Sequence, residues 1–296
     1  MINYLKAKNI LKKAKIKIQD EEILIKNSLN RVVAKDIISP SNHPLGDNAA
    51  FDGFAINSKD TKNLNKKNSK QFRILGSIAA GNKPFNKNVK KFDTIEVMTG
   101  GIISKPFNTI IPIEKIHFYP SKQNPKFIII DRKVSKNNHI RFKGSDYKKR
   151  QLIIKKGTII RPNHILALKT LGVRKIKVKK KLNIIFFSTG NEISNLDKIP
   201  IWKVRSSNGY YIENLNENFL FNFKDGGTLR DNHQNLFTFK MKKILKSKTN
   251  IIITSGAVSA GKFDYIPSVV KKFKTTHYFK GTMIRPGKPI LFAKIK

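Results

Sequence analysis

The pattern of apolar and polar positions divides the chain into three parts. Between residues 46 and 139, short apolar stretches alternate with turn residues, which is typical of an all-β segment. From residue 183 to 296, short apolar strands alternate with helical patterns, which favours a mostly parallel α/β sheet with helices on both faces. We therefore predict an all-β insertion over 46–139 and an α/β domain over 183–296. Residues 1–45 and 140–182 form a discontinuous third part.

The same periodicities predict individual elements. Helices are expected at 3–18, 163–171, from Ser206 or Ser207 to about 219, at 234–245 and at 267–273. Strands are expected at 54–56, 72–78, 92–98, 110–113, 157–160, 182–187, near 221, and at 251–254, 278–284 and 290–295. Between the aromatics Phe51 and Phe54, the dipeptide Asp52-Gly53 is by default a hairpin turn.

One stretch near the end of the chain has the form of an anion site. The apolar strand 251–254 leads directly into the small residues 255–261, and Asp264 and a predicted helix follow. Small residues let backbone N–H groups approach a ligand, and a helix N-terminus adds partial positive charge. Taken alone, however, the stretch is better interpreted as a tight strand-to-helix turn.

Further polar residues follow the ends of neighbouring predicted strands. In an open α/β sheet, ligands bind beyond the carboxyl ends of the strands. Glu192, Asp231 and Asp264 stand at such ends, and carboxylates beside a phosphate cradle suit Mg²⁺. Arg285 and Lys288 could clamp an oxyanion. The competing interpretation is that each acid only caps a helix N-terminus. That interpretation suits any one of the acids but explains all three together less well.

Composition changes this picture little. The 296 residues are 39% hydrophobic and carry a formal net charge of +41. Such a charge could attract nucleic acid, but the lysines are spread along the chain beside abundant Asn, Ile and Phe, so A/T-rich codon usage explains it without a partner. The absence of Cys excludes disulfides and thiolate metal sites. The sequence shows no secretory segment and no membrane-length apolar run, so we expect a cytoplasmic protein.

Seven short motifs in one order resemble those of a known family. They resemble the MoeA and gephyrin E-domain family of molybdopterin molybdenumtransferases, and the resemblance runs from about residue 5 to the end. The motifs are DNAAFDGFA from 47, MTG from 98, STGNE from 188, SSN from 206, RD from 230, TSGAVSAGKFDY from 254 and RPGKP from 285.

The resemblance implies an elongated, multidomain homodimer with a dimerisation role for the discontinuous part. It implies insertion of molybdenum from molybdate into adenylylated molybdopterin, with a divalent cation such as Mg²⁺ and release of AMP. Carried over by motif, the catalytic residues are Asp52 and Thr99 from the partner's insertion, together with Asp231 and Asp264. The metal ligands are Glu192, Asp231 and Asp264. Substrate contacts fall to Ser188, Thr189, Gly190, Ser207, Asn208, Ser255, Gly256, Ser259, Arg285 and Lys288.

Two departures from the family pattern suggest alternatives. Ala257 stands where the family usually has a second glycine, so a Cβ could narrow the cradle. Family members also continue into a C-terminal β-barrel domain, so we expect a chain that lacks it. A catalytically impaired protein that still binds a pterin nucleotide is therefore the second hypothesis. Non-specific nucleic-acid binding is the third and weakest, because no recognition module is present.

Overall fold

The computed structural model describes residues 1–217, 220–257 and 264–295. The chain divides into two compact units. The first consists of residues 1–35, 156–162 and 175–296, and the second of residues 36–155 and 163–174. This division differs from the three parts expected from the sequence, which remain a prediction.

The first unit is built on a three-stranded parallel sheet in the order β16-β13-β17. Its helices are α1 (Tyr4–Lys13), η1 (Ile25–Asn27), α3 (Asn208–Asn214), α4 (Gln234–Leu245) and α5 (Ile266–Lys271). Its strands are β1 (Asp20–Leu24), β12 (Lys175–Lys179), β13 (Leu182–Thr189), β14 (Ile193–Ser194), β15 (Val204–Arg205), β16 (Phe221–Leu229), β17 (Ile251–Ser255), β18 (Thr275–Lys280) and β19 (Leu291–Ile295).

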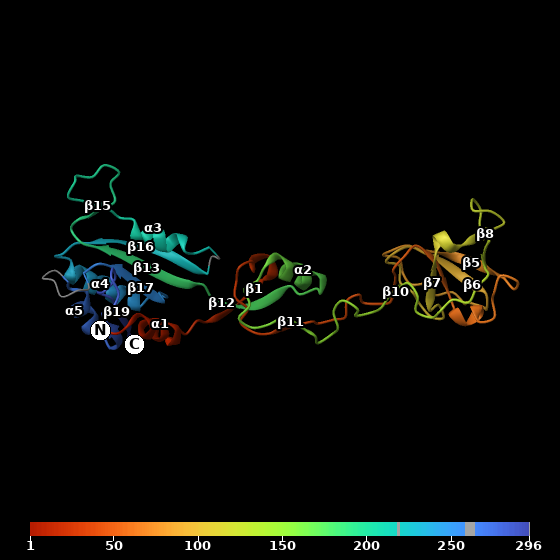
Figure 1. Ribbon diagram of the computed structural model, residues 1–296, viewed down its shortest axis with the longest axis horizontal. Coiled ribbons are helices and arrows are strands. Elements are labelled where there is room, and N and C mark those ends of the chain that lie inside the picture. Colours follow the sequence, from red (N-terminus) through yellow and green to blue (C-terminus); the bar gives the residue numbers. More distant parts are fainter. Residues whose placement is uncertain (218–219, 258–263, 296) are drawn as a thin grey trace. The chain divides into compact units, whose positions relative to one another are not determined.

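Helices cover both faces of this sheet, as Figure 1 shows. On one face Phe187 packs against Phe237 of α4, with ring centroids 5.6 Å apart, inside a buried cluster that also includes Val269 of α5. On the other face Phe186 lies beneath Gly209 of α3. Successive residues of a strand point to opposite faces, so the apolar run of β13 is buried on both sides. The predicted α/β architecture is confirmed.

The second unit contains a six-stranded sheet in the order β7-β4-β6-β5-β9-β8. Its strands are β2 (Ile37–Ile38), β3 (Asn48–Ala49), β4 (Gly53–Ile56), β5 (Lys70–Ile78), β6 (Asp93–Val97), β7 (Thr109–Pro112), β8 (His117–Tyr119), β9 (Phe127–Ile130), β10 (Ile140–Arg141) and β11 (Leu152–Ile154). Its short helices are η2 (Ser58–Thr61) and η3 (Ile113–Lys115), and all but the first residue of α2 (Pro162–Thr170) belongs to it.

Alternation along β4, an interior strand of this sheet, separates two cores. Phe54 and Ile56 enter one buried cluster, whereas Ala55 between them enters the other. The sheet is therefore apolar on both faces, which explains why its strands read as short continuous runs.

Several predicted elements differ from the observed ones. Helix α3 is shorter than expected, and Ser207 at its N-cap makes no side-chain capping bond. The stretch 157–160 forms only a bridge between Ile159 and Val32. Strands β18 and β19 pair with each other in antiparallel fashion and form a separate two-stranded sheet.

The predicted hairpin turn at Asp52-Gly53 is wrong. Gly53 opens β4 and pairs with Val97 on one side and Pro112 on the other. A Cβ on Gly53 would lie 2.1 Å from the carbonyl oxygen of Ile111. The glycine therefore permits the close approach of β4 to its neighbour β7, which a dipeptide rule cannot detect.

None of the helices in the described part of the chain combines the length and apolar character needed to cross a membrane.

Gly53→Ala should lower the free energy of unfolding by about 2 kcal/mol or more, because backbone must shift to admit the methyl group. Urea unfolding measures the effect. Gly46→Ala is the matched control in the same unit, since its Cβ would meet only the flexible side chain of Ile102, at 3.3 Å. Equal losses in both variants would contradict the close-approach argument.

Candidate functional site

Three loops leave the carboxyl ends of adjacent parallel strands and are joined to one another there. The N–H of Gly190, after β13, donates to the carbonyl of Leu229 at the end of β16, at 2.9 Å. The hydroxyl of Thr189 donates to the carbonyl of Ser255 at the end of β17. Parallel pairing places these strand ends at one edge, which is where open α/β sheets bind ligands.

The loop after β17 comes close to the end of β13. Gly256 has φ +90°, and a Cβ there would lie 2.6 Å from the hydroxyl oxygen of Thr189. Glycine is required at this position both by its backbone conformation and by the space. Gly256 is exposed, so its backbone is accessible to a ligand.

The Ser-Ser-Asn segment lies beside the same edge. The hydroxyls of Ser188 and Ser206 are 2.9 Å apart. Ser207 and Asn208 are exposed at the start of α3, and the side chain of Ser207 is not used to cap the helix. Among the residues that the structure describes, none bonds to either side chain. Ser188 and Thr189, in contrast, are buried at 4% and 3% exposure and hold the loop.

The carboxylates of Glu192 and Asp231 belong to two of these loops. The Glu192 carboxylate lies against Gly190, because a Cβ on Gly190 would be 2.3 Å from its Oε2. The N–H of Asp231 donates to the side-chain oxygen of Asn191 at 3.3 Å. Within the described residues, neither carboxylate forms an ion pair.

Asp264 is half-buried and directly precedes Tyr265, a residue that the sequence reasoning missed. The Tyr265 hydroxyl donates to the carbonyl oxygen of Arg230 at 3.0 Å. Burial, and secondarily the negative charge of Asp231, raises the pKa of Tyr265 to about 12. Tyr265 is therefore a neutral donor that joins its loop to the Arg230 loop. In the sequence, the signal that could have identified Tyr265 is its aromatic hydroxyl directly after the candidate acid Asp264.

The three predicted metal ligands do not form a metal site by themselves. Among the described residues, no group of three acidic or histidine side chains is placed to hold a metal ion. Mg²⁺ binds proteins through one or two carboxylates and completes its shell with water and phosphate oxygens. The unpaired carboxylates of Glu192 and Asp231 fit that mode, provided that a ligand supplies the remaining oxygens.

Arg285 and Lys288 lie in the turn between β18 and β19. The N–H of Thr282 donates to the carbonyl of Lys288 at 2.9 Å, which fixes the turn. Both basic side chains are exposed, and neither makes a hydrogen bond or an ion pair to another described residue. No described contact brings them to the loops at the sheet edge, so their predicted role in oxyanion binding remains a prediction.

Asp52 and Thr99 are brought together within the second unit. Asp52 Oδ1 accepts a bond from the Thr99 N–H at 2.6 Å and from its hydroxyl at 2.7 Å. These two bonds, the backbone one first, lower the pKa of Asp52 below its usual value. Asp52 is exposed, so the pair presents a fixed, ionised carboxylate to solvent.

Ser259, the remaining predicted substrate contact, lies outside the described residues. Ala257, two residues before it, has φ +52°, a left-handed conformation that residues other than Gly, Asn and Asp seldom adopt. The N–H of Ile266 donates to the Ala257 carbonyl at 3.3 Å. The position expected to be glycine from the family pattern therefore does have a glycine-like backbone.

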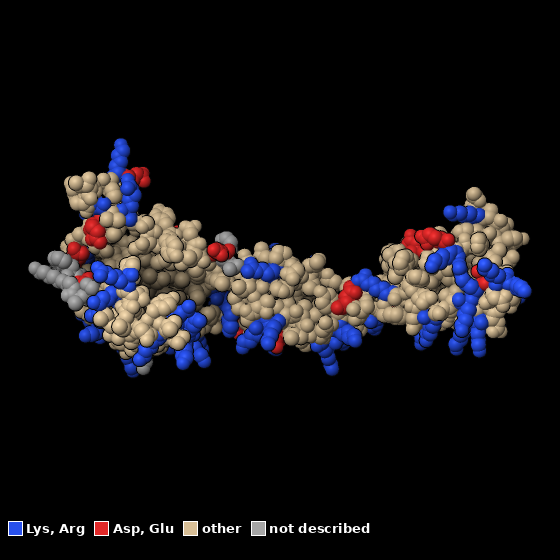
Figure 2. All heavy atoms as spheres, viewed as in Figure 1, with Lys and Arg blue, Asp and Glu red and all other residues tan. Residues whose placement is uncertain are grey.

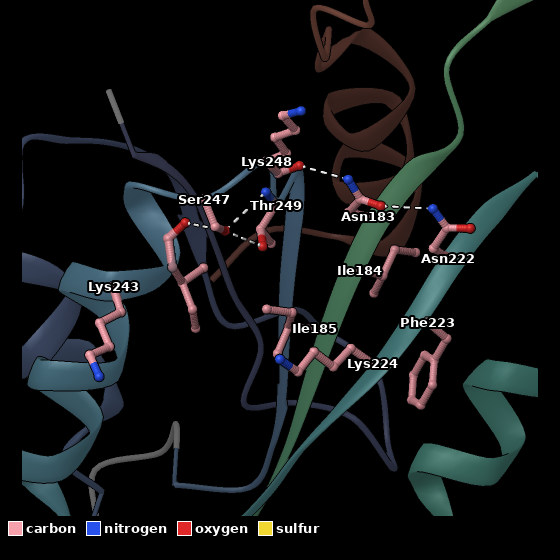
Figure 3. Close-up of a pocket in the computed structure, with 11 residues that line it drawn as sticks. Asn183, Ile184, Ile185, Asn222, Phe223, Lys224, Lys243, Ser247, Lys248 and Thr249 are labelled. Atoms are coloured by element: carbon pink, nitrogen blue, oxygen red, sulfur yellow. Dashed lines mark hydrogen bonds between the residues drawn. The ribbon is translucent and has the colours of Figure 1, made fainter.

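A hollow of about 470 Å³ lies at the opposite, amino edge of the parallel sheet (Figure 3). Its amide groups bond to one another: Asn222 donates to Asn183, and Asn183 donates to the carbonyl of Lys248, both at 2.9 Å. These groups seal the sheet edge, and the lysines around them are exposed. We place the candidate site at the carboxyl edge because its hydroxyls, carboxylates and exposed backbone converge there.

Thr99→Val should raise the pKa of Asp52, because a donor to the ionised carboxylate is lost while the backbone donor remains. A lowered folded-state pKa adds stability above the unfolded value of about 3.9, which is lost as the pH falls through the folded pKa. That acid-induced loss should be smaller in the variant. Carboxyl NMR titration measures both effects. Asp146, whose pKa is lowered mainly by its hydrogen bond from Arg141, is the internal control. An unchanged Asp52 pKa would refute the role of the hydroxyl.

Ala257→Gly should raise the free energy of unfolding by about 0.5 kcal/mol, because relief of left-handed strain exceeds the lost methyl packing and the added chain entropy. The matched control is Ala14→Gly, since Ala14 has φ −68° and no strain to relieve. That control should be destabilised. Thermal unfolding of both variants gives the sign of each change in the free energy of unfolding. A destabilised Ala257→Gly protein would show that the conformation of Ala257 carries no net strain.

Comparisons of the sequence and of the structure relate this chain to known proteins. A profile described as the MoeA N-terminal region (domain I and II) matches residues 2–172, and one described as a probable molybdopterin binding domain matches residues 185–296. The molybdopterin molybdenumtransferase of Staphylococcus aureus is 30% identical over 90% of this chain and 62% of its own length. The enzyme of the same name from Haemophilus influenzae is 29% identical over 94% of this chain and 66% of its own length.

Two crystal structures of the molybdopterin biosynthesis MoeA protein from Pyrococcus horikoshii are similar to this chain, with TM-scores of 0.86 and 0.81 and identities of 26% and 27%. They are matched over 100% and 99% of this chain and over 72% of each of those chains. The chain thus spans 62% of the length of the first curated relatives. With one family profile covering more than half of its residues and a second covering most of the rest, the chain belongs to the MoeA family.

Proposed function

We propose that this chain acts in molybdenum cofactor biosynthesis by inserting molybdenum from molybdate into adenylylated molybdopterin, with release of AMP. The observation that carries the proposal is the junction of three loops at the carboxyl edge of β13, β16 and β17 in a chain of the MoeA family. These loops offer hydroxyls, exposed backbone and unpaired carboxylates, which is the chemistry that a pterin nucleotide with linked phosphates requires.

Each group at the edge has a role in this proposal. Ser207, Asn208, Ser255, Gly256 and Ser259 contact the pterin nucleotide, and Ser188, Thr189 and Gly190 shape the loop beneath it. Asp231 and Asp264 act on the reacting phosphate, while Arg285 and Lys288 bind molybdate or phosphate. Bound Mg²⁺ would supply positive charge beside the phosphates, held by Glu192 and the two aspartates together with ligand oxygens.

The Asp52–Thr99 pair has a place in the same proposal. We propose a cytoplasmic homodimer in which Asp52 of the partner subunit, fixed by Thr99 of the partner subunit, completes the site. An ionised carboxylate already oriented by two hydrogen bonds requires no rearrangement when substrate binds.

A pterin-nucleotide binding protein without turnover is the second candidate. It is favoured by Ala257, because its Cβ stands in the loop where the family usually has a second glycine. The charge does not favour nucleic-acid binding, because Lys and Arg are scattered over both units in the view of Figure 2.

The two candidates are separated by an assay of AMP release from adenylylated molybdopterin. The reaction contains molybdate and Mg²⁺, and AMP is measured by chromatography. The wild-type chain should release AMP. Asp231→Asn should lower the rate on the order of 100-fold, the scale on which one group that stabilises transition-state charge contributes. Glu213→Ala, which removes an exposed carboxylate on α3, is the matched control and should leave the rate unchanged.

Substrate affinity, measured by calorimetry, completes the test. If the wild type binds the substrate without releasing AMP, and Asp231→Asn binds it with equal affinity, the chain is a binding protein and not the proposed enzyme. Failure of the wild type to bind adenylylated molybdopterin would overturn both candidates.

A further inference from the structure

The guanidinium of Arg230 lies inside the turn that follows β13. Its Nη1 donates to the carbonyl oxygens of Ile193, Asn191 and Gly190, at 2.9, 3.0 and 3.4 Å. The Asn191 carbonyl also accepts a bond from Lys203 Nζ. Charge-assisted bonds are stronger than neutral ones, so this nitrogen holds the turn at three points.

The backbone of Arg230 is itself held from two sides. Its N–H donates to His233 Nδ1 at 3.0 Å, and its carbonyl accepts the Tyr265 hydroxyl bond at 3.0 Å. Tyr265 is only 7% exposed, so this bond is shielded from solvent. Arg230 is therefore a fixed point that connects the loops after β13 and β16 with the segment before α5.

The two unpaired carboxylates of the candidate site depend on this fixed point. Glu192 lies within the turn whose carbonyls Arg230 holds, and Asp231 is the next residue along the chain. The N–H of Asp231 also bonds to Asn191 in the turn, at 3.3 Å. Loss of the guanidinium would leave the carbonyls of Gly190 and Ile193 without their donor and the Asn191 carbonyl with Lys203 alone, and would release Glu192 relative to Asp231.

We propose that Arg230 is a positioning residue, whose guanidinium sets the relative placement of Glu192 and Asp231 and does not bind the substrate phosphates. The functional part of this inference rests on the proposed molybdenum insertion activity. The competing role is direct phosphate binding, for which Arg is well suited. The contacts favour positioning, because Nη1 is directed at the protein's own backbone.

Three variants of the full chain test the inference. Arg230→Met keeps the length of the side chain without donors. Arg230→Lys restores one cationic nitrogen, which can donate to several carbonyls. Arg205→Met is the matched control, because Arg205 is exposed and its Nη2 donates to a single carbonyl, that of Asp197, at 2.8 Å.

Amide hydrogen exchange over residues 190–194 is the first readout and requires no turnover. Exchange in this segment should rise at least tenfold in Arg230→Met, return most of the way in Arg230→Lys, and stay unchanged in Arg205→Met. Unchanged exchange in a folded Arg230→Met protein would overturn the inference, even if the wild type released no AMP.

Steady-state AMP release is the second readout. Misplacement of groups near the chemistry by about 1 Å can lower rates on the order of 100-fold, so kcat should fall 10- to 100-fold in Arg230→Met while KM changes less than threefold. Arg230→Lys should recover most of the rate. A raised KM at constant kcat, without rescue by Lys, would instead assign Arg230 to phosphate binding. A wild type without AMP release would count against the proposed function, and hydrogen exchange would then decide on Arg230.

Discussion

The candidate site depends on the parallel pairing of β13 with a strand on each side. Phe187 pairs with Thr254 of β17, and Thr189 pairs with Leu229 of β16, so the three strands end at one edge. Parallel pairing in turn depends on burial of both sheet faces, since helices must cover each side. Phe186 and Phe187, 1% and 2% exposed, provide that burial on opposite faces. Two neighbouring aromatic residues thereby determine where three loops meet.

Elements with a strong local signal could be predicted from the sequence. The periodic stretch Gln234–Leu245 forms α4 within the predicted bounds, and the apolar runs at 182 and 251 begin the central strands. The local sequence is sufficient to predict these elements, because burial of their apolar residues dominates their stability. Family motifs add the Asp52–Thr99 pair, of which local pattern alone indicates only a turn at Asp52.

The features that could not be predicted depend on contacts between distant residues. Gly53 has the local signature of a turn, yet its role is set by the carbonyl of Ile111, a neighbour only in the folded sheet. Ser207 is of a residue type that favours the N-cap position of a helix, but its side chain makes no capping bond. The contacts of Arg230 join positions about 40 residues apart, and no local pattern encodes them. Short motifs therefore indicated the candidate site, whereas the structure shows how its loops are joined.

The basic side chains at the carboxyl edge of the sheet bind backbone carbonyls, and this has a functional consequence. The chain carries 60 Lys and Arg residues against 19 Asp and Glu, so carboxylates near basic side chains would be expected to form ion pairs. At this edge Arg230 and Lys203 instead donate to backbone carbonyls. Within the described part of the chain, the carboxylates of Glu192 and Asp231 keep their oxygens free of ion pairs. A carboxylate already paired with Arg would have to break that pair before it could bind a cation or a reacting group, which costs free energy. Directing the cations to the backbone both fixes the loops and leaves the acids available.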